Sequence, residues 1–317
     1  MLGLNLLWFL VSCSVLVVSA SYLVKSLSKL AAFLRVSEFV AAFILMAFAT
    51  SVPELFVGIS SGLSGKGALA LGTVIGSNIA NLSIVIGITV LLARGIKIDS
   101  TKIKKDSLYM ILIMLLPAIL MAIGGVLSRI DAVILILVFG FYVWKMLSER
   151  KEFRKVLEDK IPRKEVVFNA FLFIACIITL FFSSSYVVKY GSALALDFGL
   201  PVIFIGLFLV ALGTSLPELV FGSKAALEGH GDMNLGNLIG SVVVNSTLVL
   251  AVTALISPIS ADFLVFFVSA VFMIIVGFLF FTFVQSGDGL DWREGLSLVF
   301  LYIFFLMVEF YLKSYIG

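Results

Sequence analysis

The residues with the clearest chemical potential lie in two short motifs, ATSVPEL at 49–55 and GTSLPEL at 213–219. In each motif the glutamate follows the serine by three residues and the threonine by four, so one helical turn brings their oxygens to the same face. Oxygen donors without histidine or cysteine are typical ligands of hard cations, and not of zinc, copper or iron. The six side chains are Thr50, Ser51, Glu54, Thr214, Ser215 and Glu218.

A second polar pair follows each motif, in LGTVIGSNIAN at 71–81 and LGNLIGSVVVN at 235–245. Ser77 and Asn81 are four residues apart, as are Ser241 and Asn245, so each pair faces one way on a helix. The glycines of these segments allow a neighbouring helix to approach closely. Together the four segments predict a cluster of hydroxyl, amide and carbonyl oxygens around only two carboxylates.

The elements that carry these residues are predicted to be membrane helices. Of the 317 residues 62% are hydrophobic and 13% are charged, and the mean hydropathy is +1.21, far outside the range of a globular domain. Apolar runs long enough to cross a ~30 Å hydrocarbon core predict an all-α polytopic membrane protein of about ten helices. We place them at 3–32, 37–63, 68–92, 107–124, 127–147, 166–194, 201–227, 233–256, 261–284 and 292–312.

Each motif contains a proline, Pro53 or Pro217, within one of these apolar segments. Proline has no N–H, so the carbonyls of Ala49 and Gly213, four residues earlier, lose their helical donors and the helix should break near the middle of the membrane. Backbone freed in this way is tolerated where it lines a cavity, and its carbonyls can bind a cation. A lone proline usually only kinks a helix, but a glutamate in the membrane costs at least ~2.5 kcal/mol and marks function.

The second half of the chain repeats the first with a shift of 164 residues and no gap. The same shift that superposes the two motifs also aligns SASYLVKSLSKLA at 19–31 with SSSYVVKYGSALA at 183–195. This predicts a duplicated unit of five helices, with a first repeat at 1–147, a basic linker at 148–165 and a second repeat at 166–317. Because five is odd, the two repeats are inverted in the membrane, as in many secondary transporters that bind substrate near the midplane.

Lysine and arginine are distributed unevenly between the predicted loops. One set of alternate loops carries 18 of the 22 basic residues, and the other loops carry only Lys66, Arg129 and Lys189. Because positive loops stay on the cytoplasmic side, we expect both termini outside and the 148–165 linker inside, in a multi-pass protein of the plasma (cytoplasmic) membrane. The net charge of +3 then needs no nucleic-acid partner, because the lipid bilayer with its anionic headgroups is sufficient.

Other chemistries find little support in the sequence. Cys13 and Cys176 lie in apolar segments without a neighbouring histidine or carboxylate, so we expect no disulfide or metal framework. The only histidine, His230, falls with Asp232 in GHGD at 229–232, which we interpret as a turn within a loop. No serine/histidine dyad, zinc motif or aspartyl protease pair can be assembled, so we expect neither an enzyme nor a cofactor. Glu309 is expected near the outer end of the last helix.

TSVPEL and TSLPEL, each followed by a glycine-rich segment that contains Gly-Ser and ends in Asn, resemble the paired alpha repeats of the cation/calcium exchanger superfamily, particularly its sodium/calcium exchanger branch. The resemblance covers nearly the whole chain in helix count, repeat order and loop placement. It implies a secondary antiporter that exchanges Na⁺ for Ca²⁺ by alternating access, in which the first and sixth helices slide across the rest.

The resemblance also implies an ion site with four adjoining positions. Backbone carbonyls of Ala47 and Ala211 would be ligands, and the two glutamates would bind Ca²⁺ directly and share the Na⁺ positions. The side-chain ligands would be Thr50, Ser51, Glu54, Ser77, Asn81, Thr214, Ser215, Glu218, Ser241 and Asn245.

Two departures from the family pattern bear on the expected activity. Ala49 replaces the glycine that is usual before the first Thr-Ser, which predicts a stiffer break. Asn245 stands where many relatives, including the potassium-dependent ones, carry aspartate. The loss of that negative, titratable group predicts exchange that is independent of K⁺ and disfavours proton coupling.

Charge arithmetic leaves the coupling ion open. Two carboxylates balance one Ca²⁺, whereas three Na⁺ would leave the same cluster at about +1 unless a glutamate is protonated, so exchange between them would move net charge. A glutamate in a low dielectric can also take up a proton, and exchange of H⁺ for Ca²⁺ or another divalent cation is therefore the alternative. A passive calcium channel is a further one, which countertransport kinetics would separate.

Overall fold

The computed structural model describes residues 2–33, 47–98, 101–148 and 162–316, which are almost entirely helical. The elements of the first half are α1 (Leu2–Phe33), α2 (Ala47–Thr50), α3 (Val52–Leu63), α4 (Gly67–Ala80), η2 (Asn81–Val85), α5 (Ile86–Ala93), β1 (Ile96–Lys97), α6 (Thr101–Gly124) and α7 (Arg129–Ser148). Those of the second half are α8 (Arg163–Asp197), α9 (Val202–Ile205), η4 (Gly206–Val210), α10 (Ala211–Thr214), α11 (Leu216–Leu227), α12 (Gly231–Val244), η5 (Asn245–Val249), α13 (Leu250–Ile256), α14 (Phe263–Ser286), β2 (Gly289–Leu290) and α15 (Trp292–Ile316).

Nine helical segments in the described part of the chain are long and apolar enough to cross a membrane. They coincide with nine of the segments predicted from the sequence, with ends that differ by a few residues. The remaining predicted segment, 37–63, starts at positions outside the described residues, and its described part is α2 and α3. Most of the predicted linker at 148–165 also lies outside the described residues.

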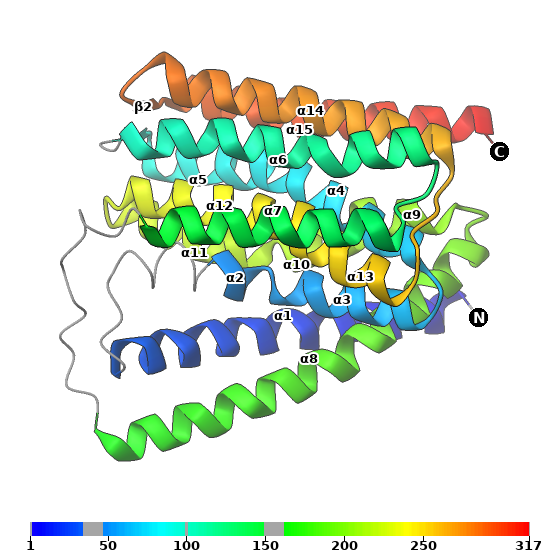
Figure 1. Cartoon of the computed structure of the whole chain (residues 1–317), viewed down its shortest axis with the longest axis horizontal. Coiled ribbons are helices and arrows are strands. Elements are labelled where there is room, and N and C mark those ends of the chain that lie inside the picture. The colour runs from blue at the N-terminus through cyan, green and yellow to red at the C-terminus, as the bar shows by residue number, and fades with distance from the viewer. Residues whose placement is uncertain (1, 34–46, 99–100, 149–161, 317) are drawn as a thin grey trace.

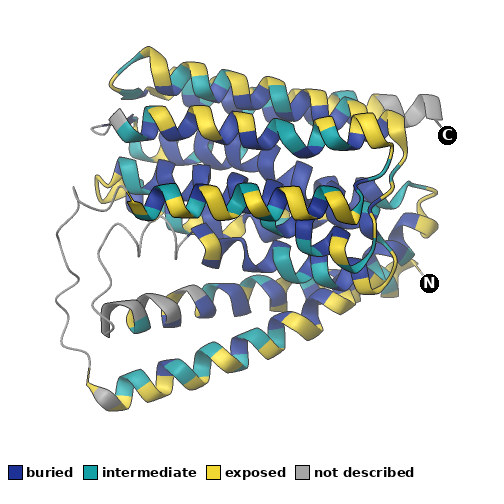
Figure 2. Ribbon diagram, viewed as in Figure 1, coloured by how far each residue is buried: buried dark blue, intermediate teal, exposed yellow. Residues whose placement is uncertain are grey.

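The helices form an inner and an outer layer. Within the spans Gly67–Ala93 and Gly231–Ile256, 83% and 78% of the residues in an apolar 18-residue stretch are buried, against 22% in such a stretch of α7. Glycines permit this inner packing, because a Cβ on Gly72 would lie 2.2 Å from the carbonyl oxygen of Ile203 on the neighbouring α9. Exposed positions lie along the outer helices (Figure 2), and many of them are large apolar residues, as expected for surfaces that face lipid.

The packing of the two halves follows the internal repeat. α5 packs against α15 and α11, and its counterpart α13 packs against α7 and α3. β1 pairs with β2 at one end of the bundle, and Leu127 bridges Ile259 at a matching pair of loops. Figure 1 shows both termini at the end of the bundle opposite β2. The fold is therefore that of a polytopic membrane protein built from two inverted repeats.

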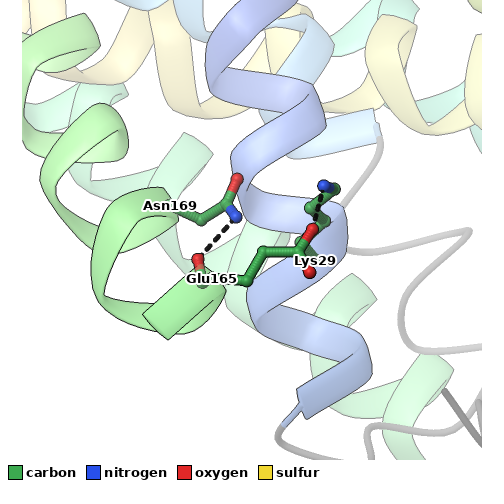
Figure 3. A network of polar contacts seen from close by, with 3 residues as sticks. All are labelled: Lys29, Glu165 and Asn169. Atoms are coloured by element: carbon green, nitrogen blue, oxygen red, sulfur yellow. Dashed lines mark hydrogen bonds and ion pairs between the residues drawn. The ribbon is translucent and has the colours of Figure 1, made fainter. Parts of the chain in front are cut away.

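The two longest helices, α1 and α8, pack against each other along one side of the bundle (Figure 1). Near one end Lys29 forms an ion pair with Glu165, whose carbonyl accepts a hydrogen bond from Asn169 within α8 (Figure 3). Near the other end Asn5 Nδ2 donates to Asp197 Oδ2 at 2.7 Å. Polar contacts therefore join these helices near both ends, with an apolar interface between them.

Candidate ion-binding site

Both proline motifs interrupt a helix at the serine. α2 ends at Thr50, Ser51 has φ −85° and ψ 2°, and α3 begins one residue before Pro53. In the second half α10 ends at Thr214, Ser215 has φ −82° and ψ 0°, and α11 begins one residue before Pro217. The helices are therefore interrupted at a single residue in each motif, as predicted, although the N–H groups of Ser51 and Ser215 still donate to the carbonyls of Ala47 and Ala211 at 3.3 and 3.0 Å.

The breaks place both glutamates in the first turn of a new helix. Glu54 lies in the first turn of α3 and Glu218 in that of α11, each a helix of 12 residues. The unsatisfied N–H groups at a helix N-terminus carry partial positive charge, which favours a carboxylate there. Both glutamates are completely buried. A buried carboxylate without a positive partner is costly, so both glutamates favour a bound cation.

One oxygen cluster joins α2 to α12. Thr50 Oγ1 lies 3.1 Å from Ser241 Oγ, and both atoms lie 3.4 Å from the carbonyl oxygen of Ala47. In an octahedral shell with metal–oxygen distances of about 2.4 Å, neighbouring oxygens are about 3.4 Å apart. The three oxygens are therefore spaced like ligands on one face of a hard-cation shell, and two hydroxyl hydrogens cannot satisfy all of their lone pairs.

A second cluster, related to the first by the repeat, joins α3 and α4 to α10. Ser77 Oγ donates to Glu54 Oε1 at 3.1 Å and lies 3.2 Å from Thr214 Oγ1. Thr214 Oγ1 lies 3.2 Å from the carbonyl oxygen of Ala211. This cluster includes a carboxylate oxygen among its direct contacts, so it can balance more positive charge than the first.

The structure brings seven of the twelve predicted ligands into these two clusters. The other five are buried, but their polar side-chain atoms have no hydrogen-bond partner in the described part of the chain; they are Ser51, Asn81, Ser215, Glu218 and Asn245. Leaving a buried polar group unpaired costs about 1–3 kcal/mol. Five residues with such groups in one region indicate that a ligand binds there. Among the described residues no group of three or more His, Cys, Asp and Glu forms a metal site, so the donors are mostly neutral oxygens.

The sequence reasoning missed two features of this site. Asn81 and Asn245 each begin a π-helical turn, η2 and η5, at matching positions of the repeats. Such turns carry an extra residue, have no reliable sequence signal and are frequent at functional sites. Asn237 was also missed: it is completely buried, and its Oδ1 lies 3.4 Å from Thr50 Oγ1. The sequence did contain one indication of its role, because Asn237 precedes Ser241 by four residues and therefore lies one helical turn before it.

Asn237 makes the two clusters unequal. Its repeat counterpart is Thr73, which donates to the carbonyl of Leu69 in its own helix at 2.8 Å. The amide nitrogen of Asn237 has no hydrogen-bond partner in the part of the chain that the structure describes. The cluster around Thr50 thus contains an additional amide oxygen that the cluster around Thr214 lacks.

One peripheral residue differs from expectation, and a second is more buried than its place near the end of a helix suggests. Asp232 lies in the first turn of α12 and not in a loop, although Gly229, with φ +82°, confirms a turn just before it. Glu309 is completely buried and accepts a hydrogen bond from Ser269 at 2.6 Å, because α14 packs against the face of α15 that carries it. Neither carboxylate belongs to the two oxygen clusters.

Comparison with known proteins gives a consistent result. The family model described as sodium/calcium exchanger protein matches residues 4–147 and 168–311. The sodium/calcium exchanger MaX1 of Methanosarcina acetivorans is 31% identical, over 98% of this chain and all of that protein. The uncharacterized membrane protein MJ0091 of Methanocaldococcus jannaschii is 29% identical, over 96% of this chain and 97% of that one.

Solved structures of the sodium-calcium exchanger NCX_Mj are similar over nearly the entire length. For NCX_Mj soaked with 100 mM Na⁺ and 10 mM Sr²⁺, the TM-score is 0.69 at 27% sequence identity, with 97% of this chain and 99% of that chain covered. For NCX_Mj soaked with zero Na⁺ and Ca²⁺ the TM-score is 0.65. The chain therefore belongs to the sodium/calcium exchanger protein family.

Proposed function

We propose that this membrane protein is a secondary antiporter that exchanges Na⁺ for Ca²⁺ by alternating access. Its family consists of exchangers and not of enzymes, and Na⁺ and Ca²⁺ are transported substrates rather than cofactors. The observation that carries the proposal is the pair of repeat-related oxygen clusters, with two buried glutamates and more acceptors than hydrogens.

In this proposal the two clusters and the five unpartnered side chains form one continuous ion site. Glu54 and Glu218 bind Ca²⁺ directly, and neutral oxygens on either side complete the Na⁺ positions. Asn237 joins the site through its contact with Thr50. The proposed ligands are Ala47, Thr50, Ser51, Glu54, Ser77, Asn81, Ala211, Thr214, Ser215, Glu218, Asn237, Ser241 and Asn245.

The charge of the site favours electrogenic exchange without K⁺. Its only carboxylates are the two glutamates, since positions 81 and 245 both carry asparagine. One Ca²⁺ neutralises two carboxylates, whereas three Na⁺ leave about one positive charge, so each cycle moves charge. The amide of Asn245 offers a weaker ligand than a carboxylate for an additional monovalent cation.

The inverted repeats supply the two access states. Exchanging the conformations of the repeats converts an inward-open form to an outward-open form around a fixed site. α1 and α8 contact the broken helices, and Ser60 of α3 lies 2.8 Å from Ser184 of α8. We infer that α1 and α8 move together across the rest, between repeats at 1–147 and 166–317, in a plasma membrane with both termini outside and the 148–165 linker inside.

Transport by the purified protein in liposomes tests the proposal. Radioactive Ca²⁺ uptake is measured with internal Na⁺, with equal internal K⁺, and with an imposed pH gradient. We expect uptake that requires internal Na⁺ and is unaffected by added K⁺. Because the charge count predicts that net positive charge leaves the liposome in each cycle, an inside-positive membrane potential should enhance uptake. Uptake driven by the pH gradient without Na⁺ would establish proton exchange instead, and uptake without any countercation would contradict an exchanger.

A further inference from the structure

A groove between α6 and α7, far from the ion site in sequence, has the chemistry of a lipid site. It has a volume of about 280 Å³ and is lined mainly by Leu112, Ile113, Leu116, Val138 and Phe141, with Tyr109 and Lys145 at one end. α6 and α7 have exposed positions along their outer side (Figure 2), and these include the large apolar residues Leu112 and Phe141. The groove is therefore apolar along its length and polar at its mouth.

The mouth of the groove holds a positive charge in place. Lys145 Nζ lies 3.0 Å from the centroid of the Tyr109 ring, an arrangement in which the π face attracts the ammonium group. Lys105 is exposed and precedes Tyr109 by four residues, so it lies on the same face of α6 one turn closer to the helix start. Two ammonium groups thus flank the polar end, and each can bind a phosphate oxygen.

The dimensions fit one leaflet. The lining of α6 from Tyr109 to Leu116 and that of α7 from Val138 to Lys145 each cover eight residues, which is about 10 Å along a helix at 1.5 Å per residue. This is about a third of a ~30 Å hydrocarbon core. The mouth points to the end of the bundle where α6 begins and α7 ends, which is the end carrying β1 and β2 and the predicted cytoplasmic side.

A second groove provides an internal comparison. It lies between α14 and α15 at the same end of the bundle, has a volume of about 290 Å³ and is lined by apolar side chains apart from Ser297. No lysine lines it, and the segment 288–294 beside it contains three carboxylates and one arginine. The two grooves are similar in volume but differ in the side chains near their polar ends, where the second has three carboxylates, Arg293 and Lys104, which donates to the Gly287 carbonyl at 2.8 Å.

We propose that the α6–α7 groove binds an anionic phospholipid, with the phosphate held by Lys145 and Lys105 and an acyl chain lying along Leu112, Leu116 and Val138. Charge selects the headgroup, and the apolar lining selects an amphiphile over a soluble anion. The α14–α15 groove accommodates an acyl chain without headgroup preference. This site is independent of ion transport, so its test does not require the exchange activity.

The tryptophans report on both grooves. Trp144 is exposed and adjacent to Lys145, and Trp292 is exposed five residues before Ser297. Two variants of the full-length protein each keep one of them, the first with Trp8→Phe and Trp292→Phe, the second with Trp8→Phe and Trp144→Phe. In liposomes, quenching by phosphatidylglycerol with brominated chains is compared with quenching by brominated phosphatidylcholine, which gives the relative affinity of each groove for the two headgroups.

We expect Trp144 to report at least a fivefold preference for phosphatidylglycerol, about the factor that one lysine near a membrane surface contributes, and Trp292 to report none. Lys145→Gln should reduce the preference, Lys145→Gln together with Lys105→Gln should abolish it, Lys145→Arg should keep it, and Val138→Phe should reduce it by filling the groove with the charges intact. Equal quenching by the two lipids at Trp144, an equal preference at Trp292, or a preference that survives the removal of both lysines would overturn the proposal.

Discussion

The close contact between α4 and η4 makes Gly76→Ala a sharp test of the site geometry. A Cβ at Gly76 would lie 2.2 Å from the carbonyl oxygen of Leu207 and 2.7 Å from the Cβ of Ala211. Ordinary contact begins near 3.4 Å, so the two segments must separate by about 1.2 Å. That displacement pulls Ser77, the next residue, away from Thr214 and the Ala211 carbonyl, which contact each other in the second oxygen cluster.

We expect two measurable consequences of Gly76→Ala. Overpacking should destabilise the protein by about 1–3 kcal/mol, seen as a lower midpoint of thermal unfolding in detergent. By analogy with active sites, where a misplacement of about 1 Å costs on the order of 100-fold, the rate of Na⁺-driven Ca²⁺ uptake should fall by a similar factor. The loss of activity should exceed what the loss of folded protein explains.

Two glycines provide matched controls. A Cβ at Gly140 on α7 or at Gly213 on α10 would meet nothing within 4 Å. Alanine is favoured over glycine in a helix by up to ~1 kcal/mol, so Gly140→Ala and Gly213→Ala should leave stability unchanged or raise it. Wild-type uptake by Gly76→Ala would refute the reasoning, because α4 and η4 would then tolerate separation without loss of the ion site.

Four further substitutions, with Thr73→Val as a control, test the roles of individual side chains. Glu54→Gln and Glu218→Gln should each abolish Na⁺-driven Ca²⁺ uptake in liposomes, because neither amide replaces the carboxylate; uptake above one tenth of wild type in either would count against direct binding. Asn237→Leu should raise the Na⁺ concentration for half-maximal exchange 5- to 100-fold, equivalent to about 1–3 kcal/mol, whereas Thr73→Val should change it less than twofold; equal effects would contradict the asymmetry. Glu309→Gln should keep its contact with Ser269 and retain uptake, and loss of uptake in a folded variant would place Glu309 in the transport process.

The fold could be predicted largely because its physical signals are strong. Apolar length fixes the spans, and the prolines at 53 and 217 fix the breaks, since no neighbouring residue can supply the missing N–H. The repeat of 164 residues reveals the inversion because an odd number of helices separates the copies. What could not be predicted are details set by packing between distant segments, such as the π turns at Asn81 and Asn245.

The candidate site could also be predicted only in part. Thr50 and Glu54 could be identified from the motif itself, because polar side chains beside a break in an apolar membrane helix are costly unless they bind a ligand. Asn237 escaped notice because its repeat counterpart is a threonine, so the symmetry that revealed the other residues concealed this one. Glu309 looked peripheral because its burial depends on how α14 covers α15, which the sequence of α15 alone does not contain.

The most direct test of the ion site is anomalous diffraction from crystals soaked with Sr²⁺, a hard divalent cation that stands in for Ca²⁺. At low Na⁺ the account predicts a single strong peak bounded by Glu54, Glu218, Thr50 and Thr214, which disappears at high Na⁺ and in Glu54→Gln. A peak elsewhere in the protein, or one between the glutamates that high Na⁺ leaves unchanged, would contradict a shared Na⁺ and Ca²⁺ site.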